Sequence, residues 1–181
     1  MVISTTQNIY LIGMMGSWKT TVGKKVAREM NINFIDIDLE IEKESKMTIV
    51  KMFNLLGEQK FRSEETRILK KVSKLSGNIV STGGGIIIQS ENRNILKETG
   101  YTIFLYASPG VLASRIKNST KRPVLNSSIP MTEQFSQIWE YRKEWYHSTA
   151  NYTIETDELN SNEVSEIICD LPMIKSQMSI N

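Results

Sequence analysis

The chain has 181 residues, of which 40% are hydrophobic and 23% charged, and these proportions are typical of a soluble globular protein with one domain. Its 22 basic and 20 acidic residues give a net charge of +2, so charge gives no reason to expect nucleic acid or an anionic membrane as a partner. The one cysteine, Cys169, excludes an intramolecular disulfide, and the one histidine, His147, cannot by itself build a metal cluster or a serine-type triad.

The first half of the chain alternates short apolar runs with stretches of helical periodicity. The expected strands cover residues 9–12 and 33–38, and the expected helices cover residues 20–30, 39–44, 48–56 and 59–75. A glycine-bearing turn follows the first strand, and the second strand ends in two acids, Asp36 and Asp38. No apolar run approaches the roughly 20 residues that a membrane-spanning helix needs.

The second half of the chain continues this alternation and carries a polar loop. The expected strands cover residues 79–81, 101–107 and 152–155, and the expected helices cover residues 108–115, 131–147 and 163–171. Residues 117–130 are polar and proline-bearing and predict a loop, and residues 172–181 are expected to be a flexible tail. Without an internal repeat or a linker, residues 1–181 predict a single domain. Alternating strands and helices favour a parallel sheet with helices on both faces, where ligands bind beyond the carboxyl ends of the strands.

Residues 13–20 lie between an expected strand and an expected helix and read Gly-Met-Met-Gly-Ser-Trp-Lys-Thr. This sequence follows the phosphate-loop pattern G-x-x-x-x-G-K-[ST] at every position except one. In such a loop, backbone N–H groups and the helix N-terminus bind the nucleotide phosphates. Lys19 would reach the β- and γ-phosphates of ATP, and the Thr20 hydroxyl would ligate Mg²⁺. The expected nucleotide-binding residues are Met14, Met15, Gly16, Ser17, Trp18, Lys19, Thr20 and Thr21.

The departing position is Trp18, where the pattern has a glycine. Glycine lets the backbone approach the phosphates closely and adopts dihedral angles that other residues adopt only at a cost of about 1–3 kcal/mol. Two readings besides a working loop therefore stay open. The segment is a glycine-rich turn without a ligand, or it is a phosphate loop whose use of ATP Trp18 severely weakens.

Further motifs follow the loop along the chain. They are Phe34-Ile35-Asp36-Ile37-Asp38, Gly57-Glu58-Gln59-Lys60-Phe61-Arg62, Ser81-Thr82-Gly83-Gly84-Gly85, Arg122-Pro123-Val124-Leu125 and Arg142-Lys143-Glu144-Trp145-Tyr146. From about Asn8 to Glu155 their order and spacing resemble those of the shikimate kinase family. The resemblance implies ATP- and Mg²⁺-dependent phosphorylation of the 3-hydroxyl of shikimate, towards the aromatic amino acids. It also implies a cytoplasmic monomer with a three-layer α/β/α P-loop kinase fold, a five-stranded parallel sheet in the order 2-3-1-4-5, and a lid over about 115–130.

Shikimate carries one carboxylate and three hydroxyls, so a site for it needs cations and hydroxyl partners. Arg62 and Arg142 are the expected clamp, because guanidinium groups hold carboxylates in a bidentate fork. By sequence alone, a surface position is favoured for Arg62, and a snorkelling side chain is favoured for Arg142, which lies on the apolar face of its helix. Glu65, three residues after Arg62, would lie on the same helical face and could orient that arginine.

The acids at the end of the second strand are expected to leave it on the same side, being two residues apart. By the resemblance, Asp38 hydrogen-bonds the reacting hydroxyl and acts as base, and Asp36 helps to hold Mg²⁺. Acids at this place would also favour the N-terminus of the next helix. Gly83, Gly84 and Gly85 would allow the backbone to approach the substrate, with the Gly84 amide as donor, or would form a plain turn.

The polar stretch around Arg122 matches the lid of the family. Its closure would bring Arg122 onto the transferring phosphate and exclude water. Arg115 matches a position that covers adenine, or is a solvated helix charge. At residues 156–158 the chain is acidic where the family often has a basic or polar adenine contact.

Three functions stay open at this point. The leading hypothesis is a shikimate kinase in which Lys19, Asp38 and Arg122 are catalytic. The second is a kinase-like protein that binds shikimate but uses ATP poorly because of Trp18. The third is a P-loop kinase for another small hydroxy acid, which would not need the pair of arginines.

Overall fold

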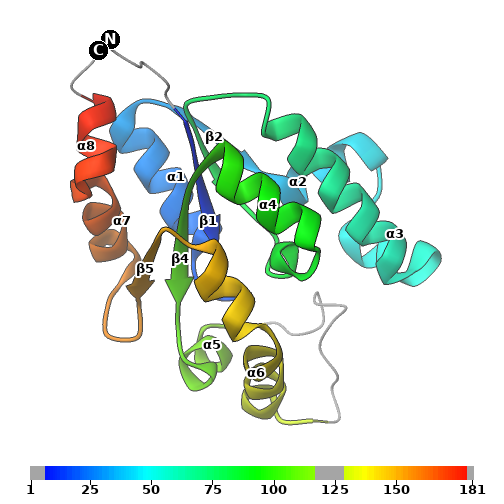
Figure 1. The fold of residues 1–181 in the computed structure, drawn as a ribbon. Helices are drawn as coiled ribbons and strands as arrows, with labels where there is room; N and C mark the ends of the chain where they lie inside the picture. Colours follow the sequence, from blue (N-terminus) through cyan, green and yellow to red (C-terminus); the bar gives the residue numbers. More distant parts are fainter. Residues whose placement is uncertain (1–6, 117–128, 179–181) are drawn as a thin grey trace.

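The computed structural model describes residues 7–116 and 129–178. Within these residues, parallel strands form a five-stranded sheet in the order β2-β3-β1-β4-β5, covered by helices on both faces (Figure 1). The strands are β1 (Asn8–Ile12), β2 (Asn33–Asp36), β3 (Asn78–Ser81), β4 (Gly100–Tyr106) and β5 (Tyr152–Glu155). The predicted fold class and strand order are therefore confirmed.

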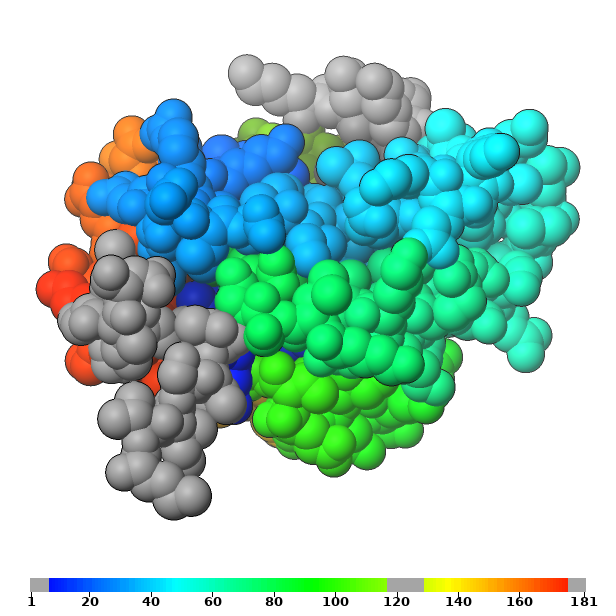
Figure 2. All heavy atoms as spheres, turned by 90° about the horizontal axis from the view of Figure 1, so that it is seen from above, coloured from blue at the N-terminus to red at the C-terminus, as the bar shows by residue number. Residues whose placement is uncertain are grey.

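The helices are divided between the two faces of the sheet. One face carries α1 (Lys19–Met30), α7 (Ser161–Asp170) and α8 (Pro172–Met178). The other carries α2 (Ile37–Ser45), α3 (Ile49–Val72), α4 (Ser90–Thr99) and α6 (Met131–Thr149). The short helix α5 (Pro109–Arg115) follows β4 and packs on α6 beyond the carboxyl end of the sheet (Figure 1). Figure 2 shows α3 (cyan to green) between the α2 region and α4 (green) on one side of the molecule.

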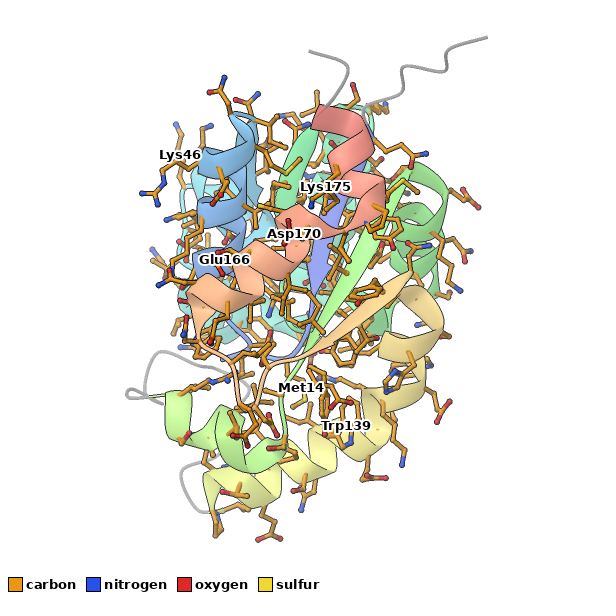
Figure 3. All side chains as sticks on the ribbon, turned by 90° about the vertical axis from the view of Figure 1, so that its left-hand side faces the viewer. Met14, Lys46, Trp139, Glu166, Asp170 and Lys175 are labelled. Atoms are coloured by element: carbon orange, nitrogen blue, oxygen red, sulfur yellow. The ribbon has the colours of Figure 1, made fainter. Side chains whose placement is uncertain are left out.

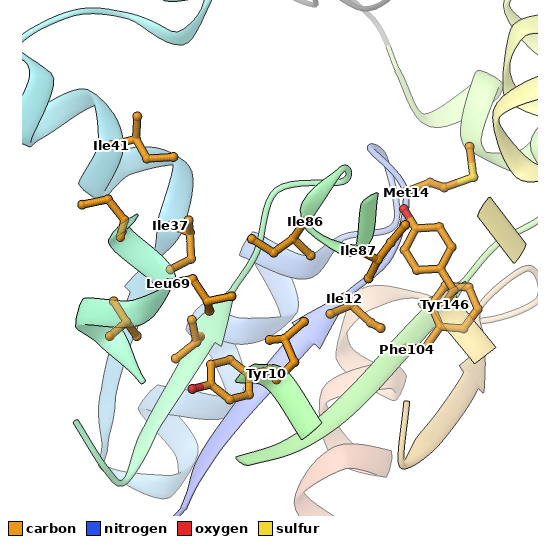
Figure 4. Close-up of a cluster of buried hydrophobic side chains, with 14 of the residues drawn as sticks. Tyr10, Ile12, Met14, Ile37, Ile41, Leu69, Ile86, Ile87, Phe104 and Tyr146 are labelled. Atoms are coloured by element: carbon orange, nitrogen blue, oxygen red, sulfur yellow. The ribbon is translucent and has the colours of Figure 1, made fainter. Parts of the chain in front are cut away.

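The alternation of side chains along β1 explains why helices cover both faces. Ile9 and Leu11 point into the core beneath α1 and α7, whereas Tyr10 and Ile12 point into the core beneath α3 and α6. All of these side chains are at most 1% exposed. Figure 4 shows the second of these cores, with Ile37 and Ile41 on one side, Phe104 and Tyr146 on the other, and Tyr10 between them. Because each such burial contributes about 1.5–3 kcal/mol, the two cores hold the strand ends in fixed positions.

The junction between β2 and α2 differs from its prediction. The strand ends at Asp36 rather than at residue 38, because the Asp36 side chain caps α2. Its carboxylate accepts hydrogen bonds from the backbone N–H groups of Asp38, at 3.1 Å, and Leu39, at 3.4 Å. Asp38 therefore lies in the first turn of a helix, and the prediction that both acids leave a strand on one side is wrong.

Two further segments also differ from the sequence prediction. Helix α4, which follows a 3₁₀ turn (Ile86–Ile88), was not predicted, because it is a largely polar helix whose buried residues are Asn92 and Leu96. The helices predicted over 48–56 and 59–75 are joined in α3 across a kink at Gly57, where φ is 80° and ψ is 167°.

The expected flexible tail is helical from Pro172 to Met178. Ile174 is fully buried with the core under α7, which accounts for this order. An ion pair between Asp170 and Lys175 (2.9 Å; Figure 3) is exposed and contributes little by comparison. The lid expected over about 115–130 falls almost wholly outside the described residues. Among the described residues, no helix is long and apolar enough to cross a membrane.

Candidate active site

A pocket of about 520 Å³ opens beyond the carboxyl ends of the strands. The phosphate loop, α2, α3, the turn after β3 and α6 all contribute to its wall. The residues expected to bind substrate all line it, and they are Asp38, Arg62, Glu65, Gly83, Gly84, Gly85 and Arg142. Residues that are 104 positions apart in the sequence (Asp38 and Arg142) thus share one cavity.

The three glycines after β3 each lie against a different part of this pocket. A Cβ added to Gly83 would lie 2.6 Å from Glu65 Oε1 and 2.8 Å from Asp38 Oδ1. A Cβ on Gly85 would lie 2.6 Å from Cζ of Arg62, and one on Gly84 would lie 3.1 Å from the backbone nitrogen of Met15. The glycine turn is therefore packed between the acids, the arginine and the phosphate loop, and a larger residue at any of these positions would force its neighbours to shift.

Arg62 and Glu65 form a buried ion pair on α3. Nη1 of Arg62 donates to Oε2 of Glu65 at 2.9 Å, and both side chains are at most 7% exposed. Nε and Nη2 of Arg62 donate to the half-exposed Glu58, at 3.2 and 3.0 Å. Burial alone would lower the pKa of Arg62, but the charges and hydrogen bonds of the two glutamates raise it, so the guanidinium stays charged. The sequence predicted the contact with Glu65 and missed the contact with Glu58.

Arg142 enters the pocket from α6. Its Nη1 lies 3.4 Å from the Gly84 carbonyl oxygen, near the limit of a hydrogen bond. Within the described residues, its buried Nε and the buried Oε1 of Glu65 have no hydrogen-bond partner. Buried polar atoms are normally paired, and these atoms face a cavity, so the pocket suits a polar ligand with both acceptors and donors.

The backbone of the phosphate loop is left-handed at the position where the pattern has glycine. Trp18 immediately precedes α1 with φ 66° and ψ 13°, which is the left-handed region that favours glycine. Its carbonyl accepts the backbone N–H of Val22 at 2.8 Å. The ammonium group of Lys19 donates to the Met14 carbonyl at 2.9 Å and to the Ser17 hydroxyl at 3.3 Å. The indole at position 18 therefore leaves the loop formed, at the cost of an unfavourable backbone conformation.

The two residues expected to hold a metal ion are in direct contact. The Thr20 hydroxyl donates to Oδ2 of Asp36 at 2.8 Å. The Ser81 hydroxyl lies 3.3 Å from the Thr20 hydroxyl. No group of three or more His, Cys, Asp and Glu side chains suited to a metal ion occurs in the described part of the chain. Mg²⁺ in nucleotide sites is commonly held by one or two carboxylates with phosphate and water, so one acid and one hydroxyl fit that ion.

The side chain of Trp18 stacks on Arg115, the last residue of α5. The Arg115 Cζ lies 3.4 Å from the centroid of the indole ring. Thr156 also holds the guanidinium, because its hydroxyl and carbonyl oxygens accept hydrogen bonds from Nη1 and Nη2 at 2.9 and 2.5 Å. Burial lowers the pKa of Arg115, and the charge of Asp157 opposes this. The indole of Trp18, the residue that departs from the loop pattern, thus covers one face of the Arg115 guanidinium beside the phosphate loop.

The remaining predicted residues have different outcomes. Met14 and Met15 lie in the phosphate loop, and both line the pocket described above. Thr21 is exposed in the first turn of α1. At residues 156–158, where the chain is acidic and the family often has a basic or polar residue, Asp157 has a structural contact. Its Oδ1 accepts a hydrogen bond from the backbone N–H of Ser108 at 2.8 Å. Arg122 lies outside the described residues.

Comparison with known proteins identifies the family. The family model for shikimate kinase matches residues 15–172. The chain belongs to the shikimate kinase family. A shikimate kinase of Caldicellulosiruptor saccharolyticus is 40% identical over 169 residues, which cover 93% of this chain and 97% of that relative. The bifunctional shikimate kinase/3-dehydroquinate synthase of Thermotoga maritima is 38% identical over 160 residues, which cover 88% of this chain and 31% of that longer protein.

Solved structures of shikimate kinases have the same fold. The shikimate kinase of Acinetobacter baumannii, solved in complex with shikimate, has a TM-score of 0.89 and 34% identity, and the match covers 95% of this chain and 96% of that one. The enzyme of Aquifex aeolicus has a TM-score of 0.76 and 36% identity, over 89% of this chain and 93% of the other. The resemblance inferred from the ordered motifs is therefore confirmed.

Sequence reasoning missed the apolar wall of the pocket in this shikimate kinase family member. Ile49, Val50, Phe53 and Phe61 of α3 and Ile138 of α6 line it. Phe53 and Phe61 pack with ring centroids 4.7 Å apart, on either side of the kink at Gly57. Their spacing of eight residues places both on one helical face, a signal that was available in the sequence but also fits an ordinary core.

Glu65 should give this shikimate kinase family member a pH-dependent stability. Burial raises the pKa of Glu65 from 4.5 to about 7; the charge of Asp38 adds to this, and Arg62 and Arg142 oppose it. Between those two pH values the folded protein keeps a proton that the unfolded chain has lost, so stability falls as pH rises through this window.

The variant Glu65→Gln lacks this titration. We expect the free energy of unfolding of the native chain to fall relative to that of Glu65→Gln by on the order of 1 kcal/mol per pH unit between about pH 5 and about pH 7. Urea unfolding of both proteins over this range measures the difference. A difference that stays constant with pH would show that Glu65 does not titrate there.

Proposed function

We propose that this protein transfers the γ-phosphoryl group of ATP to the 3-hydroxyl of shikimate, with Mg²⁺, as a cytoplasmic monomer. One observation carries the proposal. The glycine turn after β3 touches the phosphate loop through Gly84, Arg62 through Gly85 and Asp38 through Gly83, so a bound acid would lie against the loop that holds the donor.

The cations of the pocket suit a single carboxylate. Arg62 and Arg142 both line it, and each guanidinium can hold a carboxylate through paired N–H donors. Glu65 already accepts one edge of Arg62 and fixes its orientation, while Glu58 is exposed enough to give way to a ligand. The hydroxyls of the acid would then face Asp38 and the glycine backbone, both of which line the same cavity.

The donor side follows from the loop. Backbone N–H groups of residues 14–20 and the N-terminus of α1 would bind the phosphates, and Lys19 would leave its contacts with Met14 and Ser17 to reach them. Thr20 and Asp36 would hold Mg²⁺, which when bound neutralises charge between the phosphates. Asp38 would take the proton of the reacting hydroxyl, and Arg122 would contact the moving phosphoryl group.

A second candidate function rests on the stack of Trp18 and Arg115. Because the indole covers one face of Arg115 beside the phosphate loop, a nucleotide must displace it to use that face. A protein with an intact acid pocket and an obstructed nucleotide site would bind shikimate and transfer phosphate slowly or not at all. The two candidates differ in what happens to ATP and agree on shikimate.

Two measurements separate the candidates. An assay of ADP release with shikimate and Mg²⁺ should show turnover that disappears when either shikimate or Mg²⁺ is left out. Calorimetric titrations with shikimate and with ATP, each alone, give the two affinities. Binding of shikimate without ATP supports the second candidate, and a folded sample that binds neither refutes both. Turnover with another hydroxy acid, such as gluconate, but none with shikimate would favour a different P-loop kinase.

A further inference from the structure

The carbonyl of Gly84 accepts hydrogen bonds from two side chains of α6. The hydroxyl of Tyr146 donates to it at 2.5 Å, and Nη1 of Arg142 lies 3.4 Å from it. On its other side, Gly84 lies against the backbone of Met15 and Gly13. The same residue therefore touches the phosphate loop and the helix that supplies the clamp arginine.

Tyr146 is held in place by packing. Its side chain is fully buried, and its ring stacks on Phe104 with centroids 4.8 Å apart and planes 4° apart. Figure 4 shows this pair at the end of the core near Met14. Burial raises the pKa of Tyr146 to about 12, so the hydroxyl remains a donor at physiological pH. A ring fixed in this way loses little further entropy when its hydroxyl binds the carbonyl.

The two donors differ in what else they could do. Arg142 lines the pocket, whereas Tyr146 is not among the residues that line it. In the described part of the chain, the buried Nε of Arg142 has no hydrogen-bond partner. A carbonyl that loses its short hydrogen bond will draw any other donor within reach closer. The donor within reach is Arg142.

We propose that Tyr146 is a positioning residue of the acid pocket: its hydroxyl makes the short hydrogen bond to the Gly84 carbonyl, which keeps the contact of Arg142 with that carbonyl at its 3.4 Å limit and so leaves the guanidinium available to the carboxylate of the ligand. This inference rests on the proposed binding of shikimate and not on turnover. It assigns to Tyr146 a role that acts through Arg142 and requires no contact with the ligand.

The variant Tyr146→Phe tests the inference, with Tyr10→Phe as a matched control. Tyr10 is also fully buried and lies in the same core, away from Tyr146 (Figure 4), and its hydroxyl makes a 2.9 Å hydrogen bond to Thr99. Both variants lose one oxygen atom and the shortest hydrogen bond of that hydroxyl, and Tyr10→Phe also loses a 3.4 Å hydrogen bond from Asn8, so a comparable fall in melting temperature is expected. We expect the dissociation constant for shikimate to rise by about tenfold in Tyr146→Phe, where the donor to the Gly84 carbonyl is lost, and to stay unchanged in Tyr10→Phe. Equal affinities in the two variants would overturn the inference.

A double-mutant cycle with Arg142→Met shows whether Tyr146 acts through Arg142. Once Arg142 is absent, the Gly84 carbonyl has no clamp residue to attract, so Tyr146→Phe should cause no further loss of shikimate affinity. If Tyr146→Phe lowers the shikimate affinity by the same factor with Arg142 present and with Arg142→Met, Tyr146 supports the pocket generally. That result would overturn the inference. If the native chain itself does not bind shikimate, the proposed function fails as well, which the titration of the native chain reveals first.

Discussion

Asp38→Asn is expected to lower the rate constant of phosphoryl transfer by about 10²–10⁴, with the affinity for shikimate changed only slightly. Asp38 lies in the first turn of α2 and lines the pocket beside Glu65, Gly83 and the two arginines. Asparagine keeps the shape and the acceptor oxygen of this side chain but cannot take a proton. Loss of rate without loss of binding is therefore the result that a base predicts.

The measurement is turnover at saturating ATP and shikimate, in the native chain and in parallel in the Trp18→Gly background. The second background ensures that slow use of ATP does not hide the effect. Glu40→Gln is the matched control, because Glu40 lies on the same helix, forms an ion pair with Lys43 at 3.4 Å and does not line the pocket. Retention of more than about a tenth of the rate in Asp38→Asn would rule out this residue as the base.

The elements that the sequence predicted well are those whose side chains alternate between two cores. β1 and β4 have nearly continuous apolar sequences because both faces are covered, and their bounds differ by at most one residue from the prediction. Helix α4 was not predicted because its outer face is polar and only Ile95 and Leu96 are apolar residues that pack on the core. The end of β2 was misplaced because apolar and acidic residues alternate over residues 35–38 as in a strand, while Asp36 caps a helix.

The composition of the candidate site could be predicted, but the contacts that tune it could not. Arg62, Glu65 and Arg142 were inferred from spacing and from the ordered motifs, and they line one pocket. The bond from Tyr146 to Gly84 joins residues 62 positions apart, and the stack of Arg115 on Trp18 depends on a left-handed backbone angle. Neither contact has a local sequence signal, because each arises only when distant elements meet at the ends of the strands.

Trp18→Gly is expected to raise the affinity for ATP by about tenfold or more and to leave the affinity for shikimate unchanged. A nucleotide that uses the covered face of Arg115 must break the cation–π contact with the indole, which is worth about 0.5–2 kcal/mol. The Cβ of residue 18 adds a steric term at the phosphates, since glycine is the residue that allows the closest backbone approach. A gain of about 1.4 kcal/mol corresponds to tenfold in affinity.

Trp18→Ala separates the two contributions, because it removes the indole and keeps the Cβ and the left-handed backbone. If alanine restores most of the ATP affinity that glycine restores, the indole on Arg115 is the obstruction. If only glycine restores it, the obstruction is the Cβ at the phosphates. Calorimetric titration of ATP into the three proteins measures this, and shikimate titrated into each is the internal control. Equal ATP affinity in all three would clear Trp18 and leave the acid residues at 157–158 as the remaining difference on the nucleotide side.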